Sequence, residues 1–507
     1  MDLAFLKYRD GHRIIIFNRR KILIKSKIEI HDKFSVIIAV TYDRISKRKK
    51  SKYTTLTYLF LPDSLNINGK TYPATKFYND LRLFLKYDTP NYTLSDISSK
   101  ERFLLKNLAK NTERFIKNRS EENLSRFKNQ VKMFAATFSS LLREETDSLI
   151  KQKAMADDDI TDFLDKINLI VSEFRATATL LKDSTLKDAH KNVMFYADEH
   201  ISNVIELQLM QLFNSIKNRK IETSSLELIV ALIESEQKYK KQKNYVSPKD
   251  KNVNPEDLLY KRNRLKKYIE SVFFLYQDIR KDGAMFEQTV LAFAAGLAMV
   301  FSTAVAFYYQ QVYGNFTMPF FIALVVGYML KDRIKGSVSQ LFVSKSHSFF
   351  YDYKIKVTNA SDNKIGLIKE KFSFVHLKKL GPKVKKHRQK DMVIGISERS
   401  LNEQIIEYKK RVTIYPKKFG NDLSDENIIG LTDITRLNFH RFIQYMDDPK
   451  KDYILVKKGE VYMKAANKVY NINIIQKYYT EEGIEFSRYR VIMNRNGIRR
   501  IENVVLD

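Results

Sequence analysis

Residues 68–71 read Asn-Gly-Lys-Thr, and Gly-Lys-Thr is the end of the P-loop motif that binds nucleotide phosphates. In a P-loop, backbone amides surround the phosphates and the lysine contacts them at the start of a helix. This sequence departs from the motif twice, since Ser64 replaces the first glycine and Pro73 lies where the helix should propagate. We therefore expect a turn built on Asn68 and Gly69 rather than a nucleotide site.

Histidine and carboxylate side chains are the next candidates, because they ligate metal ions. His190 and His200 lie ten residues apart in a segment with a helical pattern, and acidic residues accompany them. That spacing puts the two rings on different turns with a large angular offset, so a shared metal needs a bend or another helix. The acidic run 157–159, with Asp162, is typical of the first turn of a helix. We therefore expect no metal site.

Enzyme motifs are absent from the sequence. It contains no dinucleotide-binding fingerprint, no His-Glu-x-x-His and no Gly-x-Ser-x-Gly. The absence of cysteine excludes disulfides, thiolate catalysis and cysteine-ligated zinc or iron–sulfur clusters. We therefore assign no catalytic residue, expect no cofactor, and favour a protein that is not an enzyme.

The chemistry that remains is electrostatic, because the formal net charge is +30. Basic runs at 44–52 and 378–390 and a basic helix at 258–280 carry part of this charge. Such an excess favours anionic lipid at the cytoplasmic leaflet. Nucleic acid is a weaker alternative, since few aromatic residues interrupt the runs, and a solvated surface is another. The residues expected to contact lipid headgroups or phosphate are Lys47, Arg48, Lys49, Lys50, Lys261, Arg262, Arg264, Lys266, Lys267, Lys331, Arg333, Lys335, Lys383, Lys385 and Lys386.

Residues 288–330 contain no Asp, Glu, Lys or Arg, although charged residues make up 29% of the chain. Residues 288–309 form a first helix of about 22 residues, which spans roughly 33 Å and matches the hydrocarbon thickness of a bilayer. A polar turn follows at 310–315. The second apolar stretch, 316–330, spans only roughly 22 Å, so it crosses only with snorkelling, local thinning or a re-entrant path. We therefore predict a two-helix transmembrane hairpin, with a buried hairpin in a soluble core as the alternative.

The charges that flank this hairpin predict its orientation. Lys and Arg stay on the cytoplasmic side of a membrane, and they occur at 280–281 and 331–335 but not in the turn. We therefore expect a multi-pass protein with both termini in the cytoplasm, in a membrane such as the bacterial inner membrane. Small residues favour close contact between membrane helices. The first helix offers four of them: Ala294, Ala295, Gly296 and Ala298.

The rest of the chain must position these features, and its hydrophobic periods predict a multi-domain α+β membrane protein. Heptad-like spacing at 124–141 and 160–181 predicts antiparallel helices with coiled-coil packing. The predicted parts are a β-rich N-terminal domain at 1–95, a helical bundle at 96–246, a basic linker and juxtamembrane helix at 247–287, the hairpin at 288–330, and an α+β C-terminal domain at 338–507 that ends in an antiparallel meander.

Finer predictions follow from the same patterns. A third bundle helix has a second apolar face at Leu207, Met210 and Phe213, so we expect it to be buried on both faces. The basic helix at 258–280 is expected to run into the first membrane helix. A further helix is expected near 432–445.

The sequence predicts where the protein lies and less of what it does there. We expect a two-pass membrane-anchored cytoplasmic scaffold, sensor or effector that binds a cytosolic partner or forms a homo-oligomer. An oligomeric membrane pore or membrane-perturbing effector is one alternative, favoured by the small residues of the first helix. A membrane-tethered nucleic-acid-binding or processing protein is the other, favoured by the net charge.

Overall fold

The computed structural model describes residues 7–9, 12–14, 24–43, 49–88, 92–99, 103–152, 156–181, 187–219, 224–246, 254–359, 362–390, 403–418, 430–480 and 483–506. The chain divides into two compact units. The sheet unit contains Met1–Leu85, Leu275–Lys418 and Leu431–Asp507, and the bundle unit contains Lys86–Phe274 and Phe419–Gly430.

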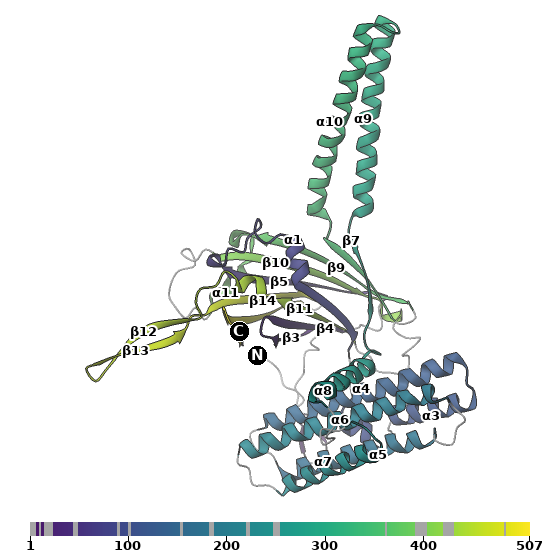
Figure 1. Ribbon diagram of the computed structural model, residues 1–507, viewed down its shortest axis with the longest axis vertical. Helices are drawn as coiled ribbons and strands as arrows, with labels where there is room; N and C mark the ends of the chain where they lie inside the picture. Colours follow the sequence, from purple (N-terminus) through teal and green to yellow (C-terminus); the bar gives the residue numbers. More distant parts are fainter. Residues whose placement is uncertain are drawn as a thin grey trace. The chain divides into compact units, whose positions relative to one another are not determined.

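Two sheets form the core of the sheet unit, and Figure 1 shows their strands as separate layers. The larger sheet contains, in spatial order, β16 (Gly497–Val504), β15 (Ile484–Asn494), β14 (Tyr470–Tyr479), β5 (Ser51–Pro62), β10 (Glu403–Ile414), β9 (Lys364–Val375), β8 (Tyr353–Thr358) and β7 (Tyr276–Lys281). The smaller sheet contains β3 (Ile24–Asp32), β4 (Ser35–Asp43), β11 (Gly430–Asn438) and β6 (Leu81–Tyr87). Neighbouring strands of the larger sheet pair antiparallel.

β5 lies in the middle of the larger sheet, between β14 and β10. Most of its side chains are buried, as its nearly continuous run of apolar and β-branched residues requires. The mixed α+β fold and the β-rich N-terminal region are therefore confirmed. The predicted domain boundaries place β5 apart from β10 and β14, whereas the structure joins all three in one sheet.

The C-terminal meander is confirmed as β14, β15 and β16. Its last turn contains Gly497 at a φ of +123°, where a Cβ would lie 2.4 Å from the Lys33 carbonyl oxygen. The backbone N–H of Ile498 donates to that oxygen at 2.8 Å, so the turn is fixed to the β3–β4 connection. The helix expected near 432–445 is mostly wrong, because β11 continues to Asn438 and α12 covers only His440–Ile443.

The bundle unit packs helices around buried heptad positions such as Phe127, Phe134 and Phe163. Its helices are α2 (Leu94–Ser98), α3 (Phe103–Lys117), α4 (Glu121–Lys151), α5 (Asp157–Thr179), α6 (Asp188–Asn218), α7 (Ser225–Gln242) and α8 (Pro255–Glu270). The second buried apolar face expected on α6 is wrong, since Leu207 and Met210 are 53% and 46% exposed. Polar side chains take the buried positions instead. Coiled-coil packing and oligomerisation stay predictions.

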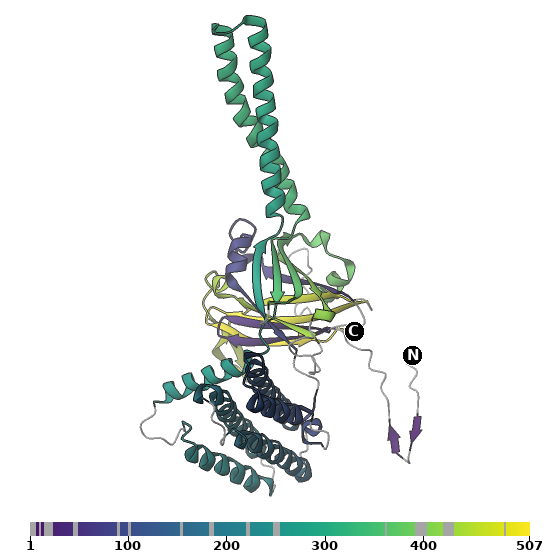
Figure 2. The same cartoon turned by 90° about the vertical axis from the view of Figure 1, so that its right-hand side faces the viewer.

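The apolar segment forms a helical hairpin of α9 (Ala284–Tyr313) and α10 (Met318–Phe349), which run side by side (Figures 1 and 2). In the described part of the chain, α9 alone is long and apolar enough to cross a membrane, by length and composition. The prediction of two such helices is therefore corrected to one. The apolar part of α10 ends at Leu330, and the same helix continues through Lys331, Asp332 and Arg333.

The hairpin enters and leaves the sheet through neighbouring strands. The helix expected to run from 258 into the membrane is wrong, because α8 ends at Glu270 and the chain forms the edge strand β7 before α9. α10 leads back into β8, the partner of β7. The remaining elements are β1 (Lys7–Arg9), β2 (His12–Ile14), α1 (Ala74–Asp80), α11 (Pro382–Gln389), β12 (Lys450–Lys457), β13 (Glu460–Asn467) and the 3₁₀ turns Asp63–Leu65, Leu377–Lys379 and Pro416–Lys418.

Candidate functional site

Residues 68–71 form the expected turn. The Asn68 side-chain oxygen accepts from the backbone N–H groups of Lys70 and Thr71 at 3.0 and 3.2 Å. These are amides that a bound phosphate would need, and α1 begins only at Ala74. The Asn68 side chain therefore occupies the amides that a nucleotide phosphate would need.

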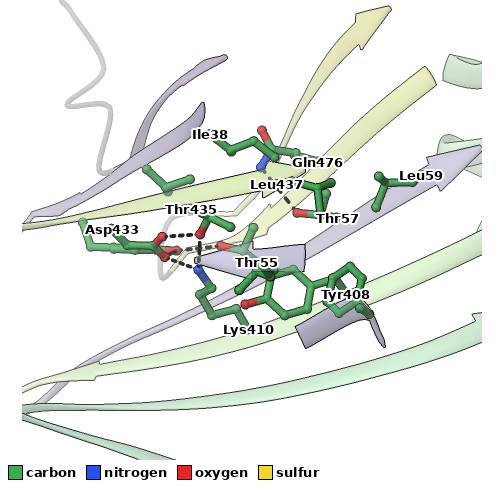
Figure 3. Close-up of a pocket in the computed structure, with 14 residues that line it drawn as sticks. Ile38, Thr55, Thr57, Leu59, Tyr408, Lys410, Asp433, Thr435, Leu437 and Gln476 are labelled. Carbon is green, nitrogen blue, oxygen red and sulfur yellow. Dashed lines mark hydrogen bonds and ion pairs between the residues drawn. The ribbon is translucent and has the colours of Figure 1, made fainter. Parts of the chain in front are cut away.

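A polar cluster lies between the two sheets (Figure 3). Lys410 of β10 donates from Nζ to Asp433 Oδ2 at 2.6 Å and to Thr435 Oγ1 at 2.8 Å, and both acceptors are on β11. Lys410 and Asp433 are only 4% and 1% exposed. The cavity beside them measures about 20 Å³, which is room for about one water molecule. The cluster therefore holds the sheets together and leaves no space for a ligand.

A second carboxylate, that of Glu370, borders this cluster. Glu370 of β9 is buried, accepts from the Tyr408 hydroxyl, and lies 3.9 Å from Lys410 Nζ. Burial raises the pKa of Glu370, although the positive charge of Lys410 opposes the shift. Burial also raises the pKa of Tyr408 well above its usual value. Lys410 Nζ therefore lies between two buried carboxylates, 2.6 Å from Asp433 and 3.9 Å from Glu370, and Asp433 is the nearer partner.

The buried polar face of α6 faces α5 and α7 in the bundle unit. Arg175 donates to Asp198 at 3.0 Å and to both oxygens of Glu236 at 2.9 and 2.8 Å. Lys240 donates to Asn203 at 2.8 Å. Opposite charges are paired within this network, so its arrangement is that of a structural core.

The two predicted candidate histidines lie in different surroundings. The ring of His190 contacts Phe115, with centroids 5.9 Å apart, whereas His200 is buried. Within the described ranges, no three His, Asp or Glu side chains gather as metal ligands. The acidic run 157–159 forms the first turn of α5, and Asp157 accepts from Ser224 and Ser225 at 3.1 Å.

His200 should make the bundle unit sensitive to acid. Burial, with the charges of Lys266 and Arg143, lowers the pKa of His200 to about 4. The unfolded chain then takes up the proton first, so stability is full above the usual pKa and is lost as pH falls toward 4. We expect the free energy of unfolding of the bundle unit to fall by about 2 kcal/mol between pH 7 and pH 5 because of His200. Amide exchange in α6 at both pH values measures the loss. His200→Gln should remove it and His190→Gln should not; an equal loss in His200→Gln would contradict the assignment.

The outer face of the larger sheet carries a row of basic side chains beside the hairpin. Arg280, Lys354, Lys369 and Arg411 are register partners on the consecutive strands β7, β8, β9 and β10. Paired residues point to the same face of a sheet, so these cations lie next to one another. Like charges directly opposite destabilise a sheet, and a counter-anion relieves that repulsion. The basic surface is defined as Arg280, Lys354, Lys356, Lys364, Lys369, Lys371, Lys409 and Arg411.

Tyr351 lies among the cations of the basic surface. Its ring centroid is 5.7 Å from Lys369 Nζ, 5.8 Å from Lys409 Nζ and 5.5 Å from Arg411 Cζ. Its hydroxyl is buried and has no hydrogen-bond partner among the described residues. The ring offers the cations some compensation through its quadrupole, but it carries no negative charge.

Carboxylates neutralise only part of the basic surface. Asp282 pairs with Lys369 at 2.9 Å, and Asp278 pairs with Arg280 at 2.8 Å. Lys354 and Lys364 have no ion pair in the part of the chain that the structure describes. The surface therefore keeps positive charge that an anionic ligand can neutralise.

The first predicted basic run borders this surface. Lys50 Nζ lies 5.9 Å from the centroid of the Tyr415 ring, and Lys364 Nζ lies 5.3 Å from the same centroid. Lys49 is exposed, while Lys47 and Arg48 lie outside the described residues. Contact of these lysines with headgroups stays a prediction.

The second basic run lies on the same face of the sheet. α11 carries Lys383, Lys385 and Lys386, and its Val384 packs with Leu56 and neighbouring apolar residues of the sheet. Leu56 is the register partner of Lys409, so α11 covers the face that also bears the basic surface. Lys50 of the first run lies beside Tyr415 at one end of β10, and α11 of the second run packs toward the other end, so the structure does not show direct contact between the two runs.

The predicted α8 residues belong to the bundle unit, and several have partners there. Lys261 pairs with Glu199 at 2.6 Å, Arg262 with Glu206 at 3.4 Å, and Lys266 with Glu270 at 3.9 Å. Arg264 and Lys267 are exposed. Headgroup contact by α8 stays a prediction.

The predicted small-residue face is partly used for contact within the hairpin. Ala294 and Ala298 are fully buried, Ala295 is half-buried, and Gly296 faces open space. Gly327 of α10 lies against α9, 3.6 Å from Val305 for an added Cβ. Both helices rise equally per residue, and Gly327 lies beside Val305. Lys331, one turn beyond Gly327, therefore lies level with the middle of α9. Arg333 and Lys335 follow toward the sheet and are exposed.

Sequence reasoning missed most of the basic surface, although a signal was present. Basic residues alternate with other residues in Tyr-Lys-Ile-Lys at 353–356 and in Lys-Glu-Lys at 369–371. In a strand, this period of two puts the basic side chains on one face. Strand order was also needed to show that these faces are adjacent.

Comparison with known proteins found no matching family model, no matching curated protein and no matching solved structure.

Proposed function

We propose that this chain is a membrane-anchored protein whose hairpin enters lipid and whose basic surface lies on the anionic cytoplasmic leaflet. The observation that carries the proposal is the exposure of α9: only 17% of its most apolar 18-residue stretch is buried inside the protein. Val300 and Phe307, for example, are 71% and 65% exposed. An exposed apolar surface of this length is unfavourable in water, and lipid removes it from water.

The hairpin geometry supports a path that returns to the side of entry. Both ends of the hairpin join neighbouring strands of one sheet, so a chain that leaves through α9 must come back through α10. From the tip at Phe316 to Lys331 the helix rises roughly 22 Å, which is less than the roughly 30 Å of a bilayer core. We propose that Lys331 and Arg333 snorkel to the cytoplasmic headgroups and that Tyr309 and Tyr313 lie at the opposite interface.

On the cytoplasmic side, we propose a scaffold or sensor role for the bundle unit. Leu207 and Met210 are exposed about one helical turn apart on α6, where a partner helix or loop can cover them. The absence of recognisable enzyme motifs from the sequence favours binding over catalysis.

The test uses the absence of cysteine from the chain. Single cysteines at Thr413 and Asp452 carry a dye on the face of the basic surface and on β12. We expect the protein to stay in carbonate-washed membranes. An environment-sensitive dye at position 413 should shift in nanodiscs with anionic lipid, less at high salt, and a dye at 452 should not. Release by carbonate, or a dye at 413 that ignores lipid charge, would refute the proposal.

A nucleic-acid-binding role is the second candidate, because Tyr351 and Tyr415 lie among the cations of the basic face. Retarded migration of RNA or DNA by the solubilised full chain, with a steep dependence on salt, would favour it. No retardation at low salt would exclude it.

An oligomeric pore is the remaining candidate. If the hairpin is inserted to its base, Lys331, Arg333 and Lys335 lie within hydrocarbon and require a water-filled lumen between copies. Release of a trapped dye from liposomes would favour the pore, and intact liposomes at high protein loading would leave the anchor.

A further inference from the structure

A cavity of about 720 Å³ lies at the foot of the hairpin, inside the sheet unit. Its basic wall contains Lys354 and Lys356 of β8 and Lys364 of β9. Arg280 and Lys281, at the end of β7, complete that wall. The cavity thus opens on the basic surface, at the point where the chain passes into α9.

Three of these five cations have a carboxylate partner, whereas the other two have none among the described residues. Arg280 pairs with Asp278 at 2.8 Å, Lys281 pairs with Glu287 at 2.9 Å, and Lys356 lies 3.7 Å from the exposed Asp362. Lys354 and Lys364 lack an ion pair among the residues that the structure describes. The cavity therefore has two positive charges available for a ligand.

Apolar side chains also line the cavity, as do the carboxylates of Asp278 and Asp282. Met285 and Phe286, in the first turn of α9, line it together with Phe350, and the rings of Phe286 and Phe350 lie 5.2 Å apart. Gly283 has a φ of +81° and packs directly under Phe350, where a Cβ would lie 2.7 Å from the ring. These apolar side chains give no favourable contact to an inorganic anion, whereas the glycerol and acyl carbons of a lipid can pack against them.

We propose that this cavity binds the phosphate headgroup of one anionic lipid, with its acyl chains along the first turns of α9. A phosphomonoester headgroup carries close to two negative charges at neutral pH, which matches the two unpaired lysines, whereas a phosphodiester carries one. The basic surface attracts anionic lipid in general, and this cavity selects among the lipids that reach it. The inference rests on the proposed membrane anchor for its supply of lipid.

The test uses the absence of tryptophan from the chain. Met285→Trp places a single tryptophan on the cavity wall, at a residue that is 84% exposed, and its fluorescence can be excited selectively above the absorption of tyrosine. The full chain in zwitterionic detergent is titrated with dioctanoyl phosphatidic acid, dioctanoyl phosphatidylcholine and inorganic phosphate. We expect a saturable fluorescence change with phosphatidic acid only.

In the same background, Lys354→Glu with Lys364→Glu should weaken binding roughly tenfold or more. Lys354→Met with Lys364→Met removes the charges without reversing them, and it should weaken binding in the same direction. The control, Lys450→Glu with Lys451→Glu, changes two exposed lysines of β12 and should leave binding unchanged.

An equal response to phosphatidylcholine would overturn the proposal, as would unchanged binding in both lysine variants. Saturation by inorganic phosphate at the same concentration would show a site for soluble anions instead. The two proposals fail separately. A chain that is released by carbonate but binds phosphatidic acid refutes the anchor and keeps the cavity. A chain that stays in the membrane but does not distinguish the lipids refutes the cavity alone.

Discussion

Val300→Arg together with Phe307→Arg should release the chain from carbonate-washed membranes. Both side chains lie on the exposed face of α9. An arginine near the centre of a membrane helix opposes insertion by about 2.5 to 3.5 kcal/mol, so the pair opposes it by roughly 5 to 7 kcal/mol. The fraction of protein that pellets with the membrane measures the effect.

The matched control for this pair lies on β12. Ile454 and Val456 are 70% and 66% exposed, so Ile454→Arg with Val456→Arg adds the same charges to an equally exposed apolar surface. This control should still pellet with the membrane. If the α9 variant pellets as well, α9 does not enter the hydrocarbon, and its exposed surface requires a protein partner.

Lys410→Met should destabilise the sheet unit by about 3 to 5 kcal/mol, because it leaves Asp433 charged and buried without its partner. The neighbouring Glu370 cannot compensate, since it is an acid itself. Amide exchange in β10 and β11 measures the loss in this unit separately from the bundle unit.

Two further variants separate the ion pair from other effects. Lys409→Met changes the adjacent residue, whose side chain lies on the basic face, and should have little effect on exchange in β10. Lys410→Met with Asp433→Leu removes both charges and should recover a large part of the loss. Equal protection in Lys409→Met and Lys410→Met would show that the buried pair contributes little.

Features that depend on local periodicity could be predicted from the sequence. The absence of charge at 288–330 is visible in the composition of the segment, and alternation with a turn at Asn496-Gly497 is enough to place the meander. The buried heptad positions of α4 and α5 also follow from spacing alone. In each case the residues that decide the structure are near one another in the chain.

Features that depend on distant pairing could not be predicted in the same way. Lys409, Lys410 and Arg411 are three consecutive cations, and only the packing of β11 against one face of β10 shows that the middle one is buried. The prediction that Leu207 and Met210 are buried was wrong for a related reason. The residues that α6 buries on its second side are charged, and they are stable there because α5 and α7 supply opposite charges.

The central position of β5 also sets the order in which the molecule can be completed during synthesis. β5 leaves the ribosome before the hairpin, but its two neighbours, β10 and β14, are made after it. The strand must therefore stay unpaired while the bundle unit and the hairpin are made, and such long-range pairing is slow and open to aggregation. If the hairpin is the membrane anchor that we propose, it emerges in this interval and reaches the membrane before the sheet is completed around its base. Closure then follows delivery, so a delay in delivery would leave the nascent chain with both its first strands and its hairpin uncovered.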